Sequence, residues 1–227
     1  VDLIVGPFFS RTFAIAAQYA KEYGIPIVNP FTTRTDILRG NEYVYKLVPS
    51  LETRAATVAY LSDLYPKSHI ILYADSTKHK KEYHAYAHYF KEKNIPFVSL
   101  PLQSNLVSAL QPDAKNLVIV LNHESAKMLM LSRDLIFKSN LDNLVMVVPE
   151  EWLNVPTYDI EYYSKLNIHF FSDYYVDETN EKTQVFIHNY TSKFGVPPTI
   201  EAFSFQGYDI TRYFVSALFN DMDVDRV

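Results

Sequence analysis

The 227-residue chain is 48% hydrophobic and 21% charged, values typical of a folded globular protein. Its 26 acidic and 21 basic residues are scattered and give a formal net charge of -5, which argues against nucleic acid as a partner because phosphate binding needs clustered lysine and arginine. The chain has no cysteine, so disulfides, thiolate metal ligands and cysteine nucleophiles are excluded. Its five glycines form no nucleotide-binding loop, and no apolar run is long enough for membrane insertion.

Short apolar runs rich in β-branched residues recur along the chain and predict buried strands. They lie at 1–5, 25–28, 70–73, 97–100, 117–121 and 144–148. The gaps between most of them are long enough for one helix. This alternation predicts an α/β protein whose parallel strands are joined by right-handed crossovers.

Apolar residues at helical spacing predict the helices between these strands. The first stripe begins at Phe13, with Ser10 as the expected N-cap and Gly24 as the C-terminal stop. Further helices are predicted over 52–64, 83–90, 126–137 and 200–219, and extended segments over 43–48 and 168–176.

Three blocks follow one another in order: VDLIVGPFFS at 1–10, GIPIVNPFTT at 24–33 and NEYVYKLVPS at 41–50. Together they resemble the type I periplasmic-binding-protein superfamily, especially branched-chain amino-acid binding proteins and receptor ligand-binding domains. The resemblance continues through IILYAD at 70–75 and QGYDI at 206–210. The resemblance implies that the chain is without the superfamily's first strand-helix-strand unit and its C-terminal strands.

The resemblance implies a shortened, two-lobed fold with a parallel sheet in each lobe and a ligand cleft between them. Lobe 1 would comprise 1–67 and 176–227, and lobe 2 would comprise 68–175. It also implies a periplasmic or other extracytoplasmic location, although residues 1–5 lack the charged start of a signal sequence. No cofactor is implied.

The candidate ligand-binding residues of lobe 1 follow its first two predicted strands. Ser10, Arg11 and Thr12 open a helix where relatives hold an α-carboxylate, and Thr32 and Thr33 occupy the matching turn after the second strand. The alternative is that Ser10 is only a cap and the threonines only shape the turn.

The candidates of lobe 2 are Glu150, Trp152, His79 and Asn122. Glu150 resembles in position the acid that neutralises an amino group in relatives, with Trp152 beside it; the alternative is a solvated loop acid. His79 stands where relatives often place an aromatic residue. The segment Asn122-His123-Glu124 replaces their usual small or aromatic residues, so a standard amino-acid pocket is not evident.

No metal site and no catalytic site are predicted. His84 and His88 have the i, i+4 spacing of a metal-binding pair, but the lysines around them favour a solvated helix face. The chain contains no persuasive nucleophile elbow, metalloprotease helix or paired-acid motif, so it is predicted not to be an enzyme.

Two functions remain open at this point. The first is solute binding or sensing, in which a small polar ligand such as an amino acid closes the two lobes and a membrane transporter is the partner. The second is a protein-interaction or envelope-scaffolding module of the same fold that has lost its small ligand.

Overall fold

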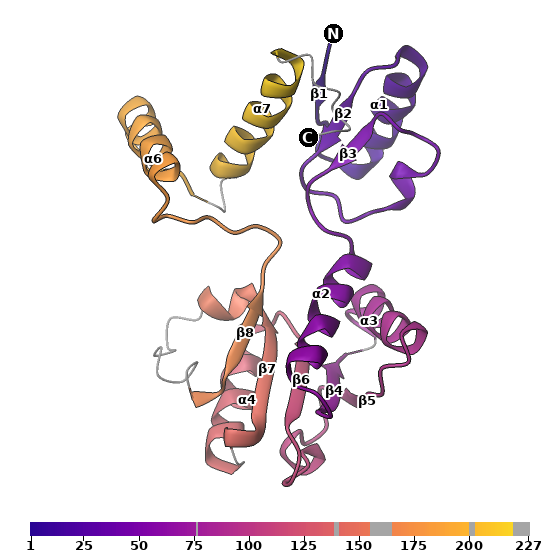
Figure 1. Cartoon of the computed structure of the whole chain (residues 1–227), viewed down its shortest axis with the longest axis vertical. Coiled ribbons are helices and arrows are strands. Elements are labelled where there is room, and N and C mark those ends of the chain that lie inside the picture. Colours follow the sequence, from indigo (N-terminus) through magenta and orange to yellow (C-terminus); the bar gives the residue numbers. More distant parts are fainter. Residues whose placement is uncertain (76, 139–140, 155–164, 200–202, 220–227) are drawn as a thin grey trace. The chain divides into compact units, whose positions relative to one another are not determined.

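The computed structural model describes residues 1–75, 77–138, 141–154, 165–199 and 203–219 (Figure 1). The chain divides into two compact units. Unit 1 comprises Val1–Val48 and Asp173–Val227, and unit 2 comprises Pro49–Ser172. Within the described residues, no helix combines the length and apolarity that a membrane crossing requires.

Unit 1 is built on a three-stranded parallel sheet in the order β1-β2-β3. The strands are β1 (Ile4–Val5), β2 (Ile27–Asn29) and β3 (Val44–Lys46). Helices cover both faces of the central strand, because Ile27 packs in one buried cluster with Phe13 of α1 (Ser10–Tyr23) whereas Val28 packs in another with Ile210 of α7 (Ser204–Phe219). Successive residues of a strand point to opposite faces, so β2 is buried on both sides.

The ends of α1 show which parts of its prediction hold. Gly24 adopts the left-handed conformation with φ 64°, and its N–H donates to the carbonyl of Ala20, so the predicted C-terminal stop is confirmed. The predicted N-cap is wrong by one residue. Ser10 is the first helical residue, and the carbonyl of Phe9 accepts from the N–H of Phe13.

Helix α6 (Glu181–Phe194) was not predicted from the sequence. Its N-cap is Asn180, whose side chain accepts from the N–H of Lys182, and it ends at Gly195. None of its residues is fully buried, and it packs on α7 mainly through Phe186, whose ring centre lies 4.3 Å from that of Tyr208. Phe186, Tyr190 and Phe194 nevertheless recur every four residues, the spacing of one helix face.

Unit 2 is built on a five-stranded parallel sheet in the order β5-β4-β6-β7-β8. Its strands are β4 (His69–Ala74), β5 (Val98–Pro101), β6 (Asn116–Leu121), β7 (Leu144–Pro149) and β8 (Ile168–Phe171). Strands β6 and β7 are buried along their whole length, as expected of parallel strands with both faces covered. The six predicted strands are present in the two sheets, each within a few residues of its expected bounds.

Among the described residues of unit 2, the helices are α2 (Leu51–Leu64), α3 (Lys80–Glu92) and α4 (Ser125–Lys138). Short 3-10 turns occur in both units. Those turns are η2 (Val107–Ala109), η3 (Leu141–Asn143), η4 (Glu150–Asn154) and η1 (Asp36–Leu38). Helices α2 and α3 share a cluster with one face of the sheet, and Leu135 of α4 lies in the cluster on the other face.

Helix α2 moves the unit boundary away from its expected position. The resemblance implied that the first segment of lobe 1 ends at 67, whereas the observed division between the units falls after Val48. The reason is packing: Ala55, Val58 and Ala59 lie in the same buried cluster as Ile70 and Leu72 of β4, so the helix belongs with unit 2. The second crossing follows Ser172, three residues before the expected one.

Candidate ligand-binding surfaces

Both sheets are entirely parallel, so the carboxyl ends of their strands lie along one edge of each sheet, where α/β proteins commonly bind ligands. In unit 1 the loops after β1 and β2 are joined by Asn29, which is fully buried. Its Nδ2 donates to the carbonyl of Pro7 at 3.3 Å, and its Oδ1 accepts from the N–H of Phe31 at 2.9 Å and of Thr32 at 3.1 Å. The carboxyl edge of unit 1 is therefore a fixed surface.

The structure places Ser10, Arg11 and Thr12 on this edge, in the exposed first turn of α1. Their backbone N–H groups precede the first intrahelical bond, from Phe13 to Phe9, and the N-terminal N–H groups of a helix attract anions. The Thr12 hydroxyl donates to the carbonyl of Phe9 at 2.9 Å.

The two threonines after β2 differ in what they do. Thr32 is buried, and its Oγ1 accepts from the N–H of Arg34 at 3.2 Å, so it shapes the turn as the alternative interpretation expected. Thr33 is half-buried on the same loop.

Three aromatic rings that the sequence analysis did not single out lie at this edge of unit 1. The ring centre of Phe31 is 5.1 Å from that of Phe8 and 4.3 Å from that of Phe203, which precedes α7. Phe8 is 53% exposed and Phe203 is 48% exposed, so the three rings offer an open apolar surface beside the N-terminus of α1.

A second polar group in unit 1 joins α7 to the segment before α6. The Tyr174 hydroxyl donates to the carboxylate of Asp209, a residue of the QGYDI block. Burial and this carboxylate raise the pKa of Tyr174, and Lys182 and Arg212 border the same hollow.

Two of the four predicted candidates in unit 2 are buried. Trp152 is entirely buried among core side chains, and its Nε1 donates to the carbonyl of Asn122 at 3.4 Å, so it does not line a surface. Asn122 is also buried, and its Oδ1 accepts from the N–H of Glu124 at 3.1 Å, which shapes the loop after β6. Glu150 is exposed at the start of η4.

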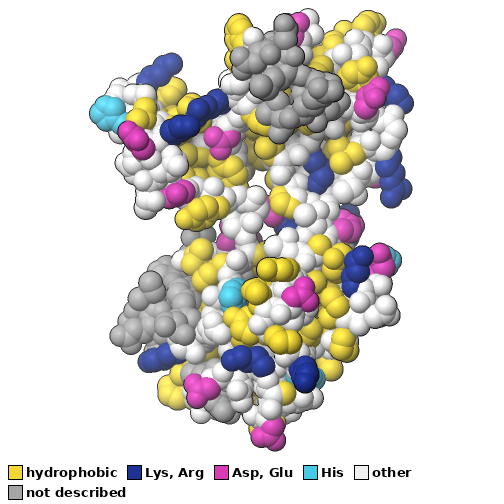
Figure 2. Space-filling model, in the orientation of Figure 1, with side chains coloured by type: hydrophobic (Ala, Val, Ile, Leu, Met, Phe, Trp, Pro, Cys, Tyr) yellow, Lys and Arg dark blue, Asp and Glu magenta, His cyan; other side chains and the backbone are white. Residues whose placement is uncertain are grey.

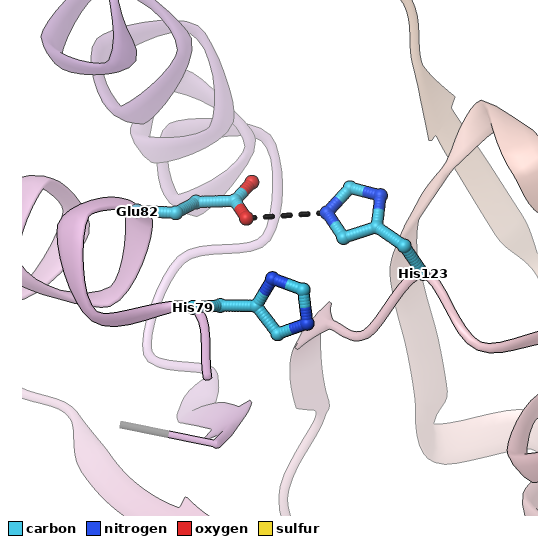
Figure 3. A group of neighbouring side chains, drawn as sticks. All are labelled: His79, Glu82 and His123. Atoms are coloured by element: carbon cyan, nitrogen blue, oxygen red, sulfur yellow. Dashed lines mark hydrogen bonds and ion pairs between the residues drawn. The ribbon is translucent and has the colours of Figure 1, made fainter. Parts of the chain in front are cut away.

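The acid of η4 that contacts another candidate loop is the next residue, Glu151, whose side chain is 50% exposed. Its Oε1 lies 3.0 Å from Nδ1 of His123, and the other ring nitrogen, Nε2, lies 3.2 Å from Oε2 of Glu82 (Figure 3). His123 follows β6, Glu82 is in the first turn of α3, and His79 is the N-cap of the same helix. The ring centres of His79 and His123 are 5.2 Å apart. We call these four residues the strand-end cluster.

The two carboxylates control the charge of His123. The hydrogen bond with Glu151 and then that with Glu82 raise the pKa of His123 from 6.5 to about 10, and His123 in turn lowers the pKa of Glu151. The imidazole therefore carries a proton at neutral pH when only these side chains surround it.

Two further contacts hold the loops around the strand-end cluster. Asp75 accepts through Oδ1 from the N–H of Thr77 at 2.8 Å and of Lys78 at 3.2 Å, and these bonds, with that from the Thr77 hydroxyl, lower the pKa of Asp75 to about 2. Lys78 also forms an exposed ion pair with Glu124 at 2.9 Å, which links the loop before α3 to the loop after β6.

Of the strand-end cluster, only His79 was a candidate from the sequence. The available signal was the position of the others: His123 and Glu151 follow strand ends directly, and Glu82 lies three residues after His79, which places both on one face of α3. The histidine pair considered from the sequence, His84 and His88, is exposed on α3.

Each of the two units contains a parallel sheet packed against helices, so the chain is an α/β protein. No protein-family model and no curated protein matches the chain. Solved structures do match. An ABC transporter substrate-binding protein from Desulfitobacterium hafniense has a TM-score of 0.64 at 18% identity, covering 99% of this chain and 66% of that chain. The branched-chain amino acid transporter substrate-binding protein LivJ from Streptococcus pneumoniae, in complex with isoleucine, has a TM-score of 0.54 at 19% identity, covering 96% and 64%.

A third similar structure is LpoA from Haemophilus influenzae, with a TM-score of 0.55 at 11% identity, covering 83% of this chain and 36% of that chain. The chain therefore has the type I periplasmic-binding-protein fold, which confirms the resemblance seen in the sequence blocks at the level of the fold. It spans 66% or less of the length of the three solved chains.

Proposed function

We propose that this chain is the ligand-binding part of an extracytoplasmic solute-binding protein that takes a small polar molecule such as an amino acid. The observation that carries the proposal is the carboxyl edge of unit 1, where the N-terminus of α1 and the rings of Phe8, Phe31 and Phe203 lie on loops joined by Asn29. Two of the similar structures are complexes with leucine and isoleucine, respectively.

An amino acid with an apolar side chain matches both parts of this edge. Its α-carboxylate would accept from the N–H groups of Ser10, Arg11 and Thr12, with the Arg11 guanidinium adding a charge of the right sign. Its side chain would pack on the exposed rings of Phe8 and Phe203. Binding is the whole activity in this proposal: no bond is made or broken, and a membrane transporter is the partner.

The direct test is thermal unfolding of the chain in the presence of leucine, isoleucine and a wider set of amino acids. A ligand present at about 100 times its Kd adds about 2.7 kcal/mol to the free energy of unfolding, which is a readily measured rise in Tm. If none of these compounds raises Tm, the proposal is wrong for amino acids.

Arg11→Glu is expected to weaken the binding of an amino acid by about tenfold or more, since tenfold corresponds to about 1.4 kcal/mol and the change reverses a charge beside the carboxylate. Isothermal titration calorimetry measures the loss. The matched control is Lys21→Glu, the same charge reversal about 15 Å further along the same helix. Equal losses in the two variants would show that net charge, not the α1 N-terminus, governs affinity.

A second candidate function, protein interaction, is favoured by one surface of unit 1. On the outer side of α1, Ile15 is 66% exposed, Tyr19 is 51% exposed and Tyr23 is 59% exposed, at a spacing of four residues that places them on one face. Contiguous exposed apolar residues are common at protein interfaces. On the face shown in Figure 2, the charges of the described residues are interspersed, with hydrophobic side chains exposed between them.

Tyr19→Glu separates the two functions. If α1 binds a protein, this variant is expected to lose a partner that the unmodified chain captures from an envelope extract, whereas Arg11→Glu retains it. If the chain is a solute-binding protein only, Tyr19→Glu is expected to keep its amino-acid affinity and to lose nothing in the capture experiment.

A further inference from the structure

Three side chains of the strand-end cluster converge on one point in unit 2. His79 and Glu82 come from the start of α3 and His123 comes from the loop after β6, and Figure 3 shows them pointing toward one another. Each offers one nitrogen or oxygen atom, and these three atoms all lie within 4.8 Å of one another. All three residues belong to unit 2, so the arrangement depends on one compact unit alone.

One of the three distances between ligand atoms is already that of a metal site. Zinc bonds of about 2.0–2.2 Å at tetrahedral angles place neighbouring nitrogen and oxygen ligands roughly 3.3 Å apart. Nε2 of His123 and Oε2 of Glu82 are 3.2 Å apart, so an ion could bridge them with little movement of either side chain. The nitrogen of His79 lies within 4.8 Å of both atoms and would move closer to complete the set.

Glu82 is the strongest sign that this point is more than an ion pair. It is only 8% exposed, and its Oε1 is buried with no hydrogen-bond partner among the described residues. A buried carboxylate oxygen that lacks a partner is costly, by about 1–3 kcal/mol or more. A cation that also contacts Oε1 removes that cost, whereas the hydrogen bond from His123 satisfies only Oε2.

Glu151 supplies the outer support that metal-binding histidines usually have. Its carboxylate lies 3.0 Å from Nδ1 of His123, which leaves Nε2 as the nitrogen that faces Glu82 and His79. Metal-ligating histidines commonly donate their second N–H to a carboxylate in this way, and the partner fixes the ring and raises its basicity. The charges also balance, since Glu82 and Glu151 together match a dication.

We propose that His79, Glu82 and His123 bind Zn²⁺, or a divalent transition-metal ion of similar preference, with the fourth coordination position open. Two imidazoles and one carboxylate suit zinc, whereas Ca²⁺ and Mg²⁺ prefer all-oxygen ligand sets. Metal coordination requires the proton on His123 Nε2 to leave, and the ion then supplies the positive charge beside Glu82, while Nδ1 keeps the proton that faces Glu151. Three protein ligands and an open position are the pattern of sites that accept a water or a small ligand on the metal.

The test is calorimetric titration of the chelator-treated full chain with ZnCl₂, with MgCl₂ as the comparison ion. The unmodified chain is expected to bind one Zn²⁺ and to leave Mg²⁺ unbound. His79→Ala and Glu82→Gln are each expected to weaken zinc binding by about 10-fold or more, and Glu151→Gln by about 10–100-fold, as removal of outer-shell partners does elsewhere. The far-UV circular dichroism of each variant shows whether it is folded. His79→Ala is the variant expected to disturb folding least, because His79 is half-buried whereas Glu82 is buried.

The matched control is the double variant His84→Ala with His88→Ala, which removes two exposed histidines from the same helix. It is expected to bind zinc as the unmodified chain does. Substitution by Co²⁺ gives a second readout, because a four-coordinate site with nitrogen and oxygen ligands has intense visible bands that His79→Ala abolishes. The proposal is overturned if the folded chain does not bind Zn²⁺, or if only the control variant loses it.

Discussion

Trp152→Ala is expected to lower the free energy of unfolding by about 3–5 kcal/mol, the usual cost of removing a large aromatic side chain from a core. Trp152 is 0% exposed and packs in the same cluster as Tyr73, Val120 and Val148, so its removal leaves a cavity that this rigid sheet cannot close. Chemical denaturation, followed by the fluorescence of tyrosine or by circular dichroism, measures the change.

The neighbouring residue gives a matched control for this prediction. Leu153 is on the same 3-10 turn but is 56% exposed, so Leu153→Ala is expected to change the free energy of unfolding by less than about 1 kcal/mol. Similar losses in the two variants would contradict the burial of Trp152. The same prediction means that a Trp152 variant tests stability and cannot serve as a test of ligand contact.

His123→Ala is expected to destabilise the metal-free chain by about 2–4 kcal/mol, because it leaves the carboxylate of Glu82 buried without its partner. The side chain of Glu82 is 10% exposed and that of His123 is 28% exposed, so water can replace only part of the lost interaction. Denaturation in the presence of a chelator isolates this effect from any metal.

A double-mutant cycle separates the cost of the unpaired Glu82 carboxylate from the cost of the packing that His123→Ala removes. Glu82→Gln in the His123→Ala background is expected to recover about 1 kcal/mol or more, because the neutral amide is less costly to bury than the carboxylate. The control is His88→Ala, which removes an exposed histidine 3.8 Å from Glu92 and is expected to cost less than about 0.5 kcal/mol. If the His123 variant behaves like this control, Glu82 is not a buried charge.

Strands β2, β4, β6 and β7 could be predicted because they are largely buried on both faces and are therefore mainly apolar. The same reasoning cannot assign a helix to a sheet. The small apolar residues of α2 predict a buried face, but only the structure shows that Ala55 and Val58 face Ile70 rather than the sheet of unit 1. Helix α6 was missed although Phe186, Tyr190 and Phe194 recur at the helical spacing of four residues, so the sequence did carry its signal.

The candidate sites could be predicted as positions but not as particular side chains. Strand ends of a parallel sheet share an edge, and the resemblance pointed to the turns at His79, Asn122 and Glu150 along it. Which residue of each turn faces the sheet edge depends on packing. Burial of Trp152 fixes the rotation of η4, and that rotation turns Glu151, rather than Glu150, toward His123.

The division of the chain after Val48 and Ser172 also affects the order in which the protein folds. Unit 2 is one uninterrupted segment, so all its strand pairings form within that segment, whereas Ile210 of α7 must reach Val28 across the whole of unit 2. Loop closure becomes entropically more costly with length, and folding slows as contacts become more distant in sequence. Unit 2 is therefore expected to fold first, and its compaction shortens the effective loop that unit 1 must close to bring α7 onto its sheet.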